Sequence, residues 1–240
     1  MTGASSLIRR RRLYEDVVER LERMIHAGEL QPGDQLPSER ELMLRFGVGR
    51  PAIREALFAM QRMGLVVVSN GERARVTMPT PETLVSELSG AARLLLSRPE
   101  GVRQFQQARC LFEVGLAQLA ARHAGPADIE RLRHALDANR RAVGDPQRFE
   151  RTDQEFHFVL ALLPRNPIFV ALHEAIVEWL TEQRRAVLRT PGIDKRAYRS
   201  HERIFKAIEA RDPVGAEAAM RTHLDATEAI FWGTEATAGQ

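Results

Sequence analysis

Apolar residues recur at helical spacing in three short segments near the start of the chain. The first segment covers residues 13–25. The second, residues 39–46, follows Ser38, and Glu41 three residues after that serine completes the capping-box pattern of a helix N-terminus. The third segment has Pro51 in its first turn, where a missing N–H costs nothing. A Gly47-Val48-Gly49 turn joins the last two segments, so the pattern predicts a helix-turn-helix.

Two short runs that favour β-strands follow the third helix. Residues 65–69 are rich in valine, residues 72–76 form the second run, and the turn pair Asn70-Gly71 lies between them. The pattern predicts a β-hairpin, and a hairpin in this place is the wing of a winged helix-turn-helix. Arg73 lies just past the wing tip, where it can contact phosphates or the minor groove.

Two arginines lie at the start of the third predicted helix. Arg50 and Arg54 are four residues apart, so they share one face of the helix. The N-terminal end of the second helix of such a unit enters the major groove, where arginine binds guanine O6 and N7 in a bidentate manner. The alternative is that both are surface charges that pair with Glu55 and its neighbours. The order of turn, caps, arginines and wing favours DNA binding.

The rest of the chain shows helical periodicity and no convincing strand, so the predicted fold is mainly α. A second domain, an all-helical bundle, is therefore expected after the winged helix-turn-helix. Its helices are predicted over residues 82–96, 101–123, 126–143, 146–163, 167–188, 195–210 and 213–231. The predicted parts of the chain are a basic N-terminal arm (1–12), the winged helix-turn-helix (13–79), a linker and connecting helix (80–99), the helical domain (100–232) and a disordered tail (233–240).

A second candidate site lies in the helical half. Asp153 and His157 are four residues apart on one predicted helix and therefore share a face, while His201 and His223 lie on two later helices. One carboxylate and three imidazoles suit Zn²⁺, with Ni²⁺ or Mn²⁺ as alternatives, and argue against an oxygen-only Ca²⁺ site. Taken singly, each histidine can instead be a hydrogen-bonded core residue, and Asp153 a partner of a surface cation. The other four histidines lack such partners and are expected at the surface or its boundary, namely His26, His123, His134 and His173.

Charge and composition add modest information. Residues up to Pro79 contain 13 arginines and 10 acidic residues, so the +3 net charge of the 240-residue chain lies in its first third. The run Arg9-Arg10-Arg11-Arg12 can be an arm that contacts phosphates or a solvated tail. No apolar run approaches the ~18 residues of a membrane helix and no signal core follows the basic start, so a cytoplasmic location is expected. Cys110 lies among apolar residues of a helix, which predicts an inert buried thiol.

The first part of the chain resembles the DNA-binding domain of GntR-type bacterial transcriptional regulators. The series PSERELM, GVGRPAIREAL, GL and NGERARV carries this resemblance through residues 13–79. The resemblance implies a homodimer that binds double-stranded DNA at a short inverted repeat, with one reading head on each half-site. The candidate DNA-contacting residues are Arg40, Gly49, Arg50, Arg54, Asn70, Gly71 and Arg73.

The helical half resembles the metal-binding version of the effector domain in the FadR-type branch of the same family. The stretch TDQEFH, followed by SHERIFKAIEARDPVGAEAAMRTHL, places Asp153, His157, His201 and His223 at the metal-binding positions of that branch. The resemblance implies one transition-metal ion per chain, facing a cavity that holds the carboxylate of a small organic acid. Arg109 matches an arginine that often faces this cavity. The alternative is a surface pair of Arg109 with Glu113, one turn later.

Four further stretches narrow the expected effector. PSERELM, NGERARV, ELSG and NPIF, in this order, are similar to the sialic-acid-responsive members of this branch. The resemblance therefore implies a sugar acid such as N-acetylneuraminate. Two rival interpretations are a metal-dependent enzyme and a regulator with a structural or metal-sensing site. A reading head fused to the bundle, and the lack of an HExxH pair or an evident general base, argue against the enzyme.

Overall fold

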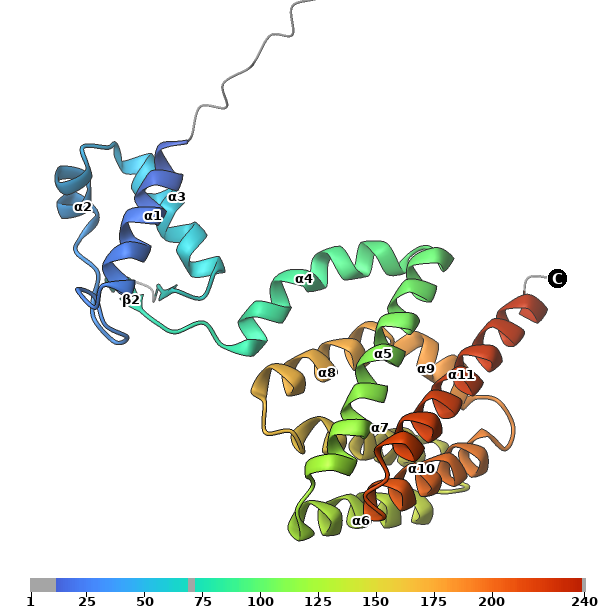
Figure 1. Ribbon diagram of the computed structural model, residues 1–240. Coiled ribbons are helices and arrows are strands. Elements are labelled where there is room, and N and C mark those ends of the chain that lie inside the picture. The colour runs from blue at the N-terminus through green and yellow to red at the C-terminus, as the bar shows by residue number, and fades with distance from the viewer. Residues whose placement is uncertain (1–11, 69–71, 239–240) are drawn as a thin grey trace, which may run out of the picture. The chain divides into compact units, whose positions relative to one another are not determined.

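The computed structural model describes residues 12–68 and 72–238, with side chains up to residue 233. The chain divides into two compact units, Met1–Glu87 and Leu88–Gln240, and each is described by itself. The division lies within the 80–99 segment for which a linker and connecting helix were predicted. Helices dominate both units (Figure 1). Among the described residues, no helix is both long enough and apolar enough to cross a membrane.

The N-terminal unit has the predicted helix-turn-helix. Its helices are α1 (Leu13–His26), α2 (Glu39–Phe46) and α3 (Arg50–Arg62). Ser38 and Glu41 form the expected capping box at the start of α2, and Gly47 ends that helix with a φ of 67°, a left-handed conformation that favours glycine. The core between the helices contains the fully buried side chains of Leu21, Leu42, Ile53 and Met60.

The wing is a small antiparallel sheet of β1 (Val66–Val67) and β2 (Arg75–Val76), in which Val66 is opposite Val76. The strands are shorter than the predicted runs because the second run also bonds to the connection between α1 and α2. The Val76 N–H donates to the Asp34 carbonyl, and the Leu36 N–H donates to the Ala74 carbonyl. The predicted wing tip, Asn70-Gly71, lies outside the described residues, as does the arm up to residue 11.

The C-terminal unit is a helical bundle (Figure 1). It contains the last part of α4 (Pro81–Leu96) and all of α5 (Pro99–His123), α6 (Pro126–Arg141), α7 (Pro146–Leu162), α8 (Pro167–Trp179), α9 (Thr181–Leu188), α10 (Ile193–Glu209) and α11 (Pro213–Ala238). Proline occupies the first turn of α5 to α8. Helix α11 packs along α5 and α10. Leu132, Phe156, Ile204 and Met220 are fully buried in the core.

Most predicted helix boundaries in the bundle agree with the structure to within two residues, but two larger differences occur. The single helix predicted over residues 167–188 is divided at Leu180, where the backbone leaves helical geometry. The Thr181 hydroxyl donates to the Val177 carbonyl at 2.8 Å, a side-chain bond of the kind that bends helices. Helix α11 continues through Gly233 to Ala238, into the segment for which a disordered tail was predicted. One glycine costs a helix only about 1 kcal/mol, and no proline follows it.

Candidate metal centre and nucleic-acid interface

Three buried histidines meet inside the bundle. His157 lies on α7, His201 on α10 and His223 on α11, and each offers a ring nitrogen within 4.8 Å of the others. Burial lowers the pKa of both His201 and His223 well below the usual value, and the neighbouring imidazoles add to the effect. These two rings are therefore neutral, which is the form that binds a metal ion.

His201 is held in one orientation by a residue that sequence analysis did not identify. Its Nδ1 lies 2.9 Å from Oδ1 of Asn139, which is fully buried on α6. An amide oxygen only accepts, so Nδ1 carries the proton and Nε2 keeps its lone pair. The Asn139 amide nitrogen in turn donates to the Thr152 hydroxyl at 3.1 Å. In the described part of the chain, His201 Nε2 is buried without a hydrogen-bond partner, as a metal ligand would be.

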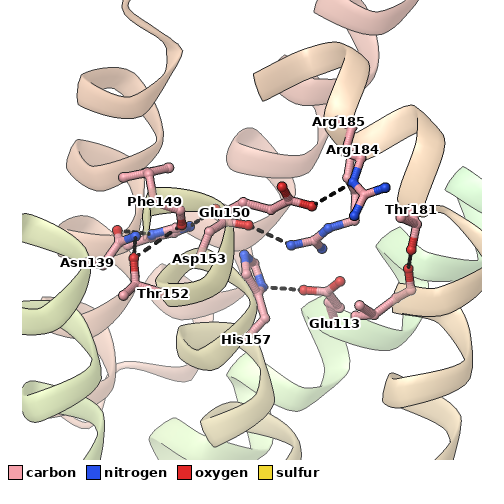
Figure 2. A network of polar contacts seen from close by, with 12 residues as sticks. Glu113, Asn139, Phe149, Glu150, Thr152, Asp153, His157, Thr181, Arg184 and Arg185 are labelled. Atoms are coloured by element: carbon pink, nitrogen blue, oxygen red, sulfur yellow. Dashed lines mark hydrogen bonds and ion pairs between the residues drawn. The ribbon is translucent and has the colours of Figure 1, made fainter. Parts of the chain in front are cut away.

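His157 is oriented from its other side by Glu113 of α5 (Figure 2). The Glu113 carboxylate contacts Nδ1 of His157 and accepts from Nε of Arg109 at 2.6 Å. Burial raises the pKa of the Glu113 carboxyl, but Arg109 and His157 outweigh it and hold that pKa well below the usual value. His157 Nε2 is then left buried without a partner among the described residues. The pair of Arg109 and Glu113 is thus an interior feature, not the surface pair of the alternative interpretation.

Asp153 lies beside the histidines but is shared with another group. Its Oδ1 is 3.5 Å from His201 Nε2, while its Oδ2 accepts from Nη2 of Arg184 at 2.6 Å (Figure 2). Arg184, on α9, is almost fully buried, and both burial and the nearby Arg109 lower its pKa. The three histidines form the compact group, and Asp153 Oδ1 lies at its edge, beside His201. These donors fit a transition-metal ion, since they combine neutral imidazoles with a carboxylate.

A pocket reaches this centre from the side of α9. Asp153 and His223 line it, as do Arg109 and Arg184. Further polar lining comes from Gln106, Gln183, Thr227 and Glu228. A small molecule in this pocket would therefore lie against Asp153 and His223.

Several expectations need correction. His173 is not a boundary residue, because it is 2% exposed and burial lowers its pKa to about 4, with Glu113 opposing that shift. Cys110 is partly exposed rather than buried, and it lines the pocket. Burial still raises the pKa of its thiol, which keeps it unreactive. His26, His123 and His134 are exposed as expected. Asn139 and Arg184 carried no distinguishing signal, since each follows a helical pattern that fits a surface position equally well.

The candidate DNA-contacting residues lie on the N-terminal unit. Those that the structure describes are all exposed, namely Arg40, Gly49, Arg50, Arg54 and Arg73. Arg50 and Arg54 pair with Glu39 on α2, not with Glu55 as in the alternative interpretation. Glu39 lies 3.6 Å from Nε of Arg50 and 3.0 Å from Nε of Arg54, so one carboxylate holds both arginines on the same side of α3.

A winged helix-turn-helix joined to a helical bundle with a buried cluster of histidines defines the class of DNA-binding transcriptional regulators with a ligand-binding domain. Comparison with known families agrees. Residues 13–76 match the bacterial regulatory proteins of the gntR family, and residues 104–226 match the FCD domain. The chain belongs to the GntR family of transcriptional regulators and carries an FCD domain. Such domains typically bind metal, and the three histidines could hold an ion here.

Individual relatives support this assignment. The chain is 48% identical over 224 residues to the HTH-type transcriptional repressor NanR of Cronobacter sakazakii, covering 92% of this chain and 86% of that protein. It is 46% identical to the repressor of the same name from Edwardsiella tarda, with the same coverage. These relatives are regulators, not enzymes, and this chain is likewise a DNA-binding transcriptional regulator.

Solved structures agree with the fold. The Streptococcus agalactiae GntR structure matches with a TM-score of 0.57 and 26% identity, over 88% of this chain and 96% of that one. The Escherichia coli McbR/YncC structure matches with a TM-score of 0.53 and 16% identity, over 94% and 99% of the two chains, and supports the fold alone.

Proposed function

We propose that the protein is a transcriptional repressor, and that a small carboxylate bound at a metal centre weakens its affinity for operator DNA. The ligands of that centre are Asp153, His157, His201 and His223. The proposal depends above all on one observation: the Nε2 atoms of His157 and His201 are buried without a partner among the described residues. Both rings lie next to that of His223, which lines a pocket. Native structures rarely leave such atoms unsatisfied without a reason.

The donor set favours Zn²⁺, with Ni²⁺ or Mn²⁺ as alternatives. When bound, the ion supplies a positive centre that attracts and orients a carboxylate. Asn139 holds the ring of His201, and Glu113 holds the ring of His157. The metal-binding nitrogens of these two rings are therefore oriented before any ion binds. Asp153 and His223 also line the pocket, which leaves the centre open toward a ligand.

The charges around the centre favour an anionic ligand. Arg109 is paired with Glu113, and Arg184 is paired with Asp153, so these four side chains balance one another. The rings of His201 and His223 are neutral because burial lowers their pKa. A divalent ion therefore adds positive charge that no described side chain of this group balances. Buried charge is costly unless it is paired, and an acid from solution would pair it.

The relatives narrow the class of acid. Two of them are named HTH-type transcriptional repressor NanR. The PSERELM, NGERARV, ELSG and NPIF stretches of the chain resemble those of sialic-acid-responsive members of the family. We infer a sugar acid as the effector, with N-acetylneuraminate as the first candidate, and repression as the mode of regulation. Polar lining by Gln106, Gln183 and Thr227 suits a hydroxylated molecule.

The operator side of the proposal depends on the exposed arginines. Arg50 and Arg54 at the N-terminal end of α3 are placed to contact bases, and Arg40 and Arg73 to contact the backbone or the minor groove. Two copies of the chain would place one reading head on each half of a short inverted repeat. The effector then acts by favouring one arrangement of the two heads over another.

The test is a titration of operator DNA, obtained by selection from a random library, with the zinc-loaded protein. N-acetylneuraminate at saturation is expected to weaken operator binding about 5- to 150-fold, the range of typical allosteric coupling. The same titration with metal-free His223→Ala should show no response. A response that survives in that variant would remove the metal from the mechanism. Chelation that unfolds the bundle would instead indicate a structural site.

A further inference from the structure

Arg184 is a buried cation whose hydrogen-bonding capacity is only partly used. Its Nη2 donates to Asp153 Oδ2 at 2.6 Å, and its side chain is 6% exposed. Its Nε and Nη1 are buried and have no hydrogen-bond partner in the described part of the chain. A guanidinium donates through all three nitrogens, and leaving charged donors buried and unpaired destabilises a protein. The side chain also lines the pocket that leads to the histidines.

Gln183, the residue before Arg184, has a buried acceptor without a hydrogen-bond donor in the described part of the chain. Gln183 lines the same pocket, and its Oε1 is buried without a partner among the described residues. An amide oxygen accepts hydrogen bonds, so this atom needs a donor. The short helix α9 thus offers the pocket an unsatisfied cationic donor and an unsatisfied acceptor from adjacent residues.

Arg109 differs from Arg184 in this respect. Its Nε donates to Glu113 at 2.6 Å, and that carboxylate in turn contacts His157. Arg109 therefore acts on the metal centre through Glu113, as a positioning residue. The donors of Arg184 without a partner in the described chain are buried, so a ligand that accepts from them would relieve a cost that the more exposed Arg109 does not carry.

We propose that Arg184 and Gln183 form an effector-recognition pair, in which Arg184 donates to an acidic oxygen and Gln183 accepts from a hydroxyl or amide N–H of the same molecule. This inference rests on the proposed function, because it takes the effector to be a small acid. It adds a selection rule: the ligand carries a hydrogen-bond donor as well as its carboxylate. Hydroxylated or N-acylated acids satisfy both residues, whereas a simple fatty acid leaves Gln183 unpaired.

The same contact couples the ligand to the metal centre. Asp153 binds Arg184 through Oδ2 and approaches His201 with Oδ1, so it joins the recognition arginine to the metal ligands. An acid that accepts from Nε or Nη1 of Arg184 therefore lies beside Asp153 and leaves the bond between Arg184 Nη2 and Asp153 in place.

The experiment compares three acids by calorimetry on the full-length, zinc-loaded protein. N-acetylneuraminate carries hydroxyls and an amide, D-gluconate carries hydroxyls, and hexanoate carries neither. The variants are Arg184→Lys and Gln183→Leu, with Arg185→Lys as the matched control. Arg185 is adjacent to Arg184 but is exposed and pairs with Glu150 at 3.0 Å, away from this pocket (Figure 2). Metal content and melting temperature are measured for each variant.

Arg184→Lys is expected to weaken binding of the first two acids about 10- to 100-fold, since hydrogen bonds to a charged group are lost. Gln183→Leu should weaken the same two acids about 2- to 10-fold, a loss typical of one neutral hydrogen bond, and leave hexanoate unchanged. Arg185→Lys should bind like wild type. Gln183 does not contact Asp153 in any described bond, so its variant decides the question even where Arg184→Lys fails to fold.

The outcomes separate the inference from the proposed function. Unchanged binding of N-acetylneuraminate in both variants overturns the inference and leaves the proposed effector intact. Gluconate binding that depends on Arg184 and Gln183, without N-acetylneuraminate binding, supports the inference and overturns sialate as effector. Wild type that binds hexanoate as tightly as gluconate overturns the selection rule. A fully metal-loaded wild type that binds none of the three acids overturns both.

Discussion

Glu39 of α2 and Arg54 of α3 form an ion pair, with Oε1 and Nε 3.0 Å apart. The other oxygen of the same carboxylate lies 3.6 Å from Nε of Arg50. Both arginines remain exposed, so the pairs are worth little to folding stability. Their consequence is geometric, because Glu39 restricts where two candidate base-reading side chains point before DNA arrives. This link crosses the turn between the two helices and so belongs to the tertiary structure.

Arg50→Ala and Arg54→Ala should each weaken binding to the selected operator by about 1–3 kcal/mol per lost base contact and relax specificity at one base pair. The reason is that a bidentate contact to guanine has no substitute in alanine. Fluorescence anisotropy with the operator and with single-base variants measures both effects. Arg62→Ala is the control, since Arg62 ends α3 and pairs with Glu87. Wild-type affinity in both variants would show that α3 does not read bases.

Glu39→Gln should lower the ratio of specific to non-specific affinity. Without the carboxylate, Arg50 and Arg54 lose their shared partner, and the reading face gains one unit of positive charge. Non-specific binding depends mainly on such charge and on salt, so it should strengthen, with a steeper dependence on salt concentration. Competition between operator and random-sequence DNA at several salt concentrations gives the ratio. Glu55→Gln, on an exposed position of α3, is the matched control, and equal ratios for the two variants would contradict the role of Glu39.

Sequence reasoning identified the elements because local rules determine them. Ser38 and Glu41 form a capping box, and prolines begin several bundle helices. The histidines were also predicted together, because their spacing matched a family pattern; the structure brings His157, His201 and His223 within 4.8 Å of one another. Local spacing does not reveal which residues support them.

The supporting residues depend on contacts between helices that are distant in sequence. Asn139 and His201 are separated by 62 residues, and Asp153 and Arg184 by 31. An asparagine between charged residues looks like a surface residue in the sequence, yet Asn139 is 0% exposed. The division of the 167–188 helix at Leu180 has no sequence signal either, since the Thr181 hydroxyl bond beside it has counterparts at Thr152 and Thr222 inside continuous helices. Such features arise from packing, which periodicity does not encode.

Asn139→Ala should weaken metal binding about 10- to 100-fold while the ligands themselves remain, as is typical when a residue that orients a metal-binding imidazole is lost. Without Asn139 the His201 ring can rotate or change tautomer, and Nε2 is no longer fixed toward the centre. Competition with a zinc-binding dye measures the affinity, and circular dichroism confirms the fold. His134→Ala is the control, because His134 is exposed on the same helix. An unchanged affinity in Asn139→Ala would mean that His201 does not bind the ion through Nε2.

His173 should make the metal-free protein less stable at acidic pH. Burial lowers its pKa from 6.5 to about 4 in the folded state, despite the opposing charge of Glu113. Below pH 6.5 the unfolded chain therefore takes up a proton that the folded chain resists until about pH 4. The free energy of unfolding falls as the pH drops through that window, and His173 accounts for about 3 kcal/mol of the decrease in total. Above pH 6.5, His173 adds no pH dependence to the stability.

The variant His173→Leu isolates this contribution. Leucine fills the buried position without a titratable group, so its unfolding free energy should fall less between pH 7 and pH 4.5 than that of wild type. Urea unfolding of metal-free protein at the two pH values gives the comparison, and the exposed His123→Leu is the control. His201 and His223 have lowered pKa values as well, so a residual decrease is expected in the variant. Equal decreases in wild type and His173→Leu would show that His173 takes up its proton in the folded protein as readily as in the unfolded chain.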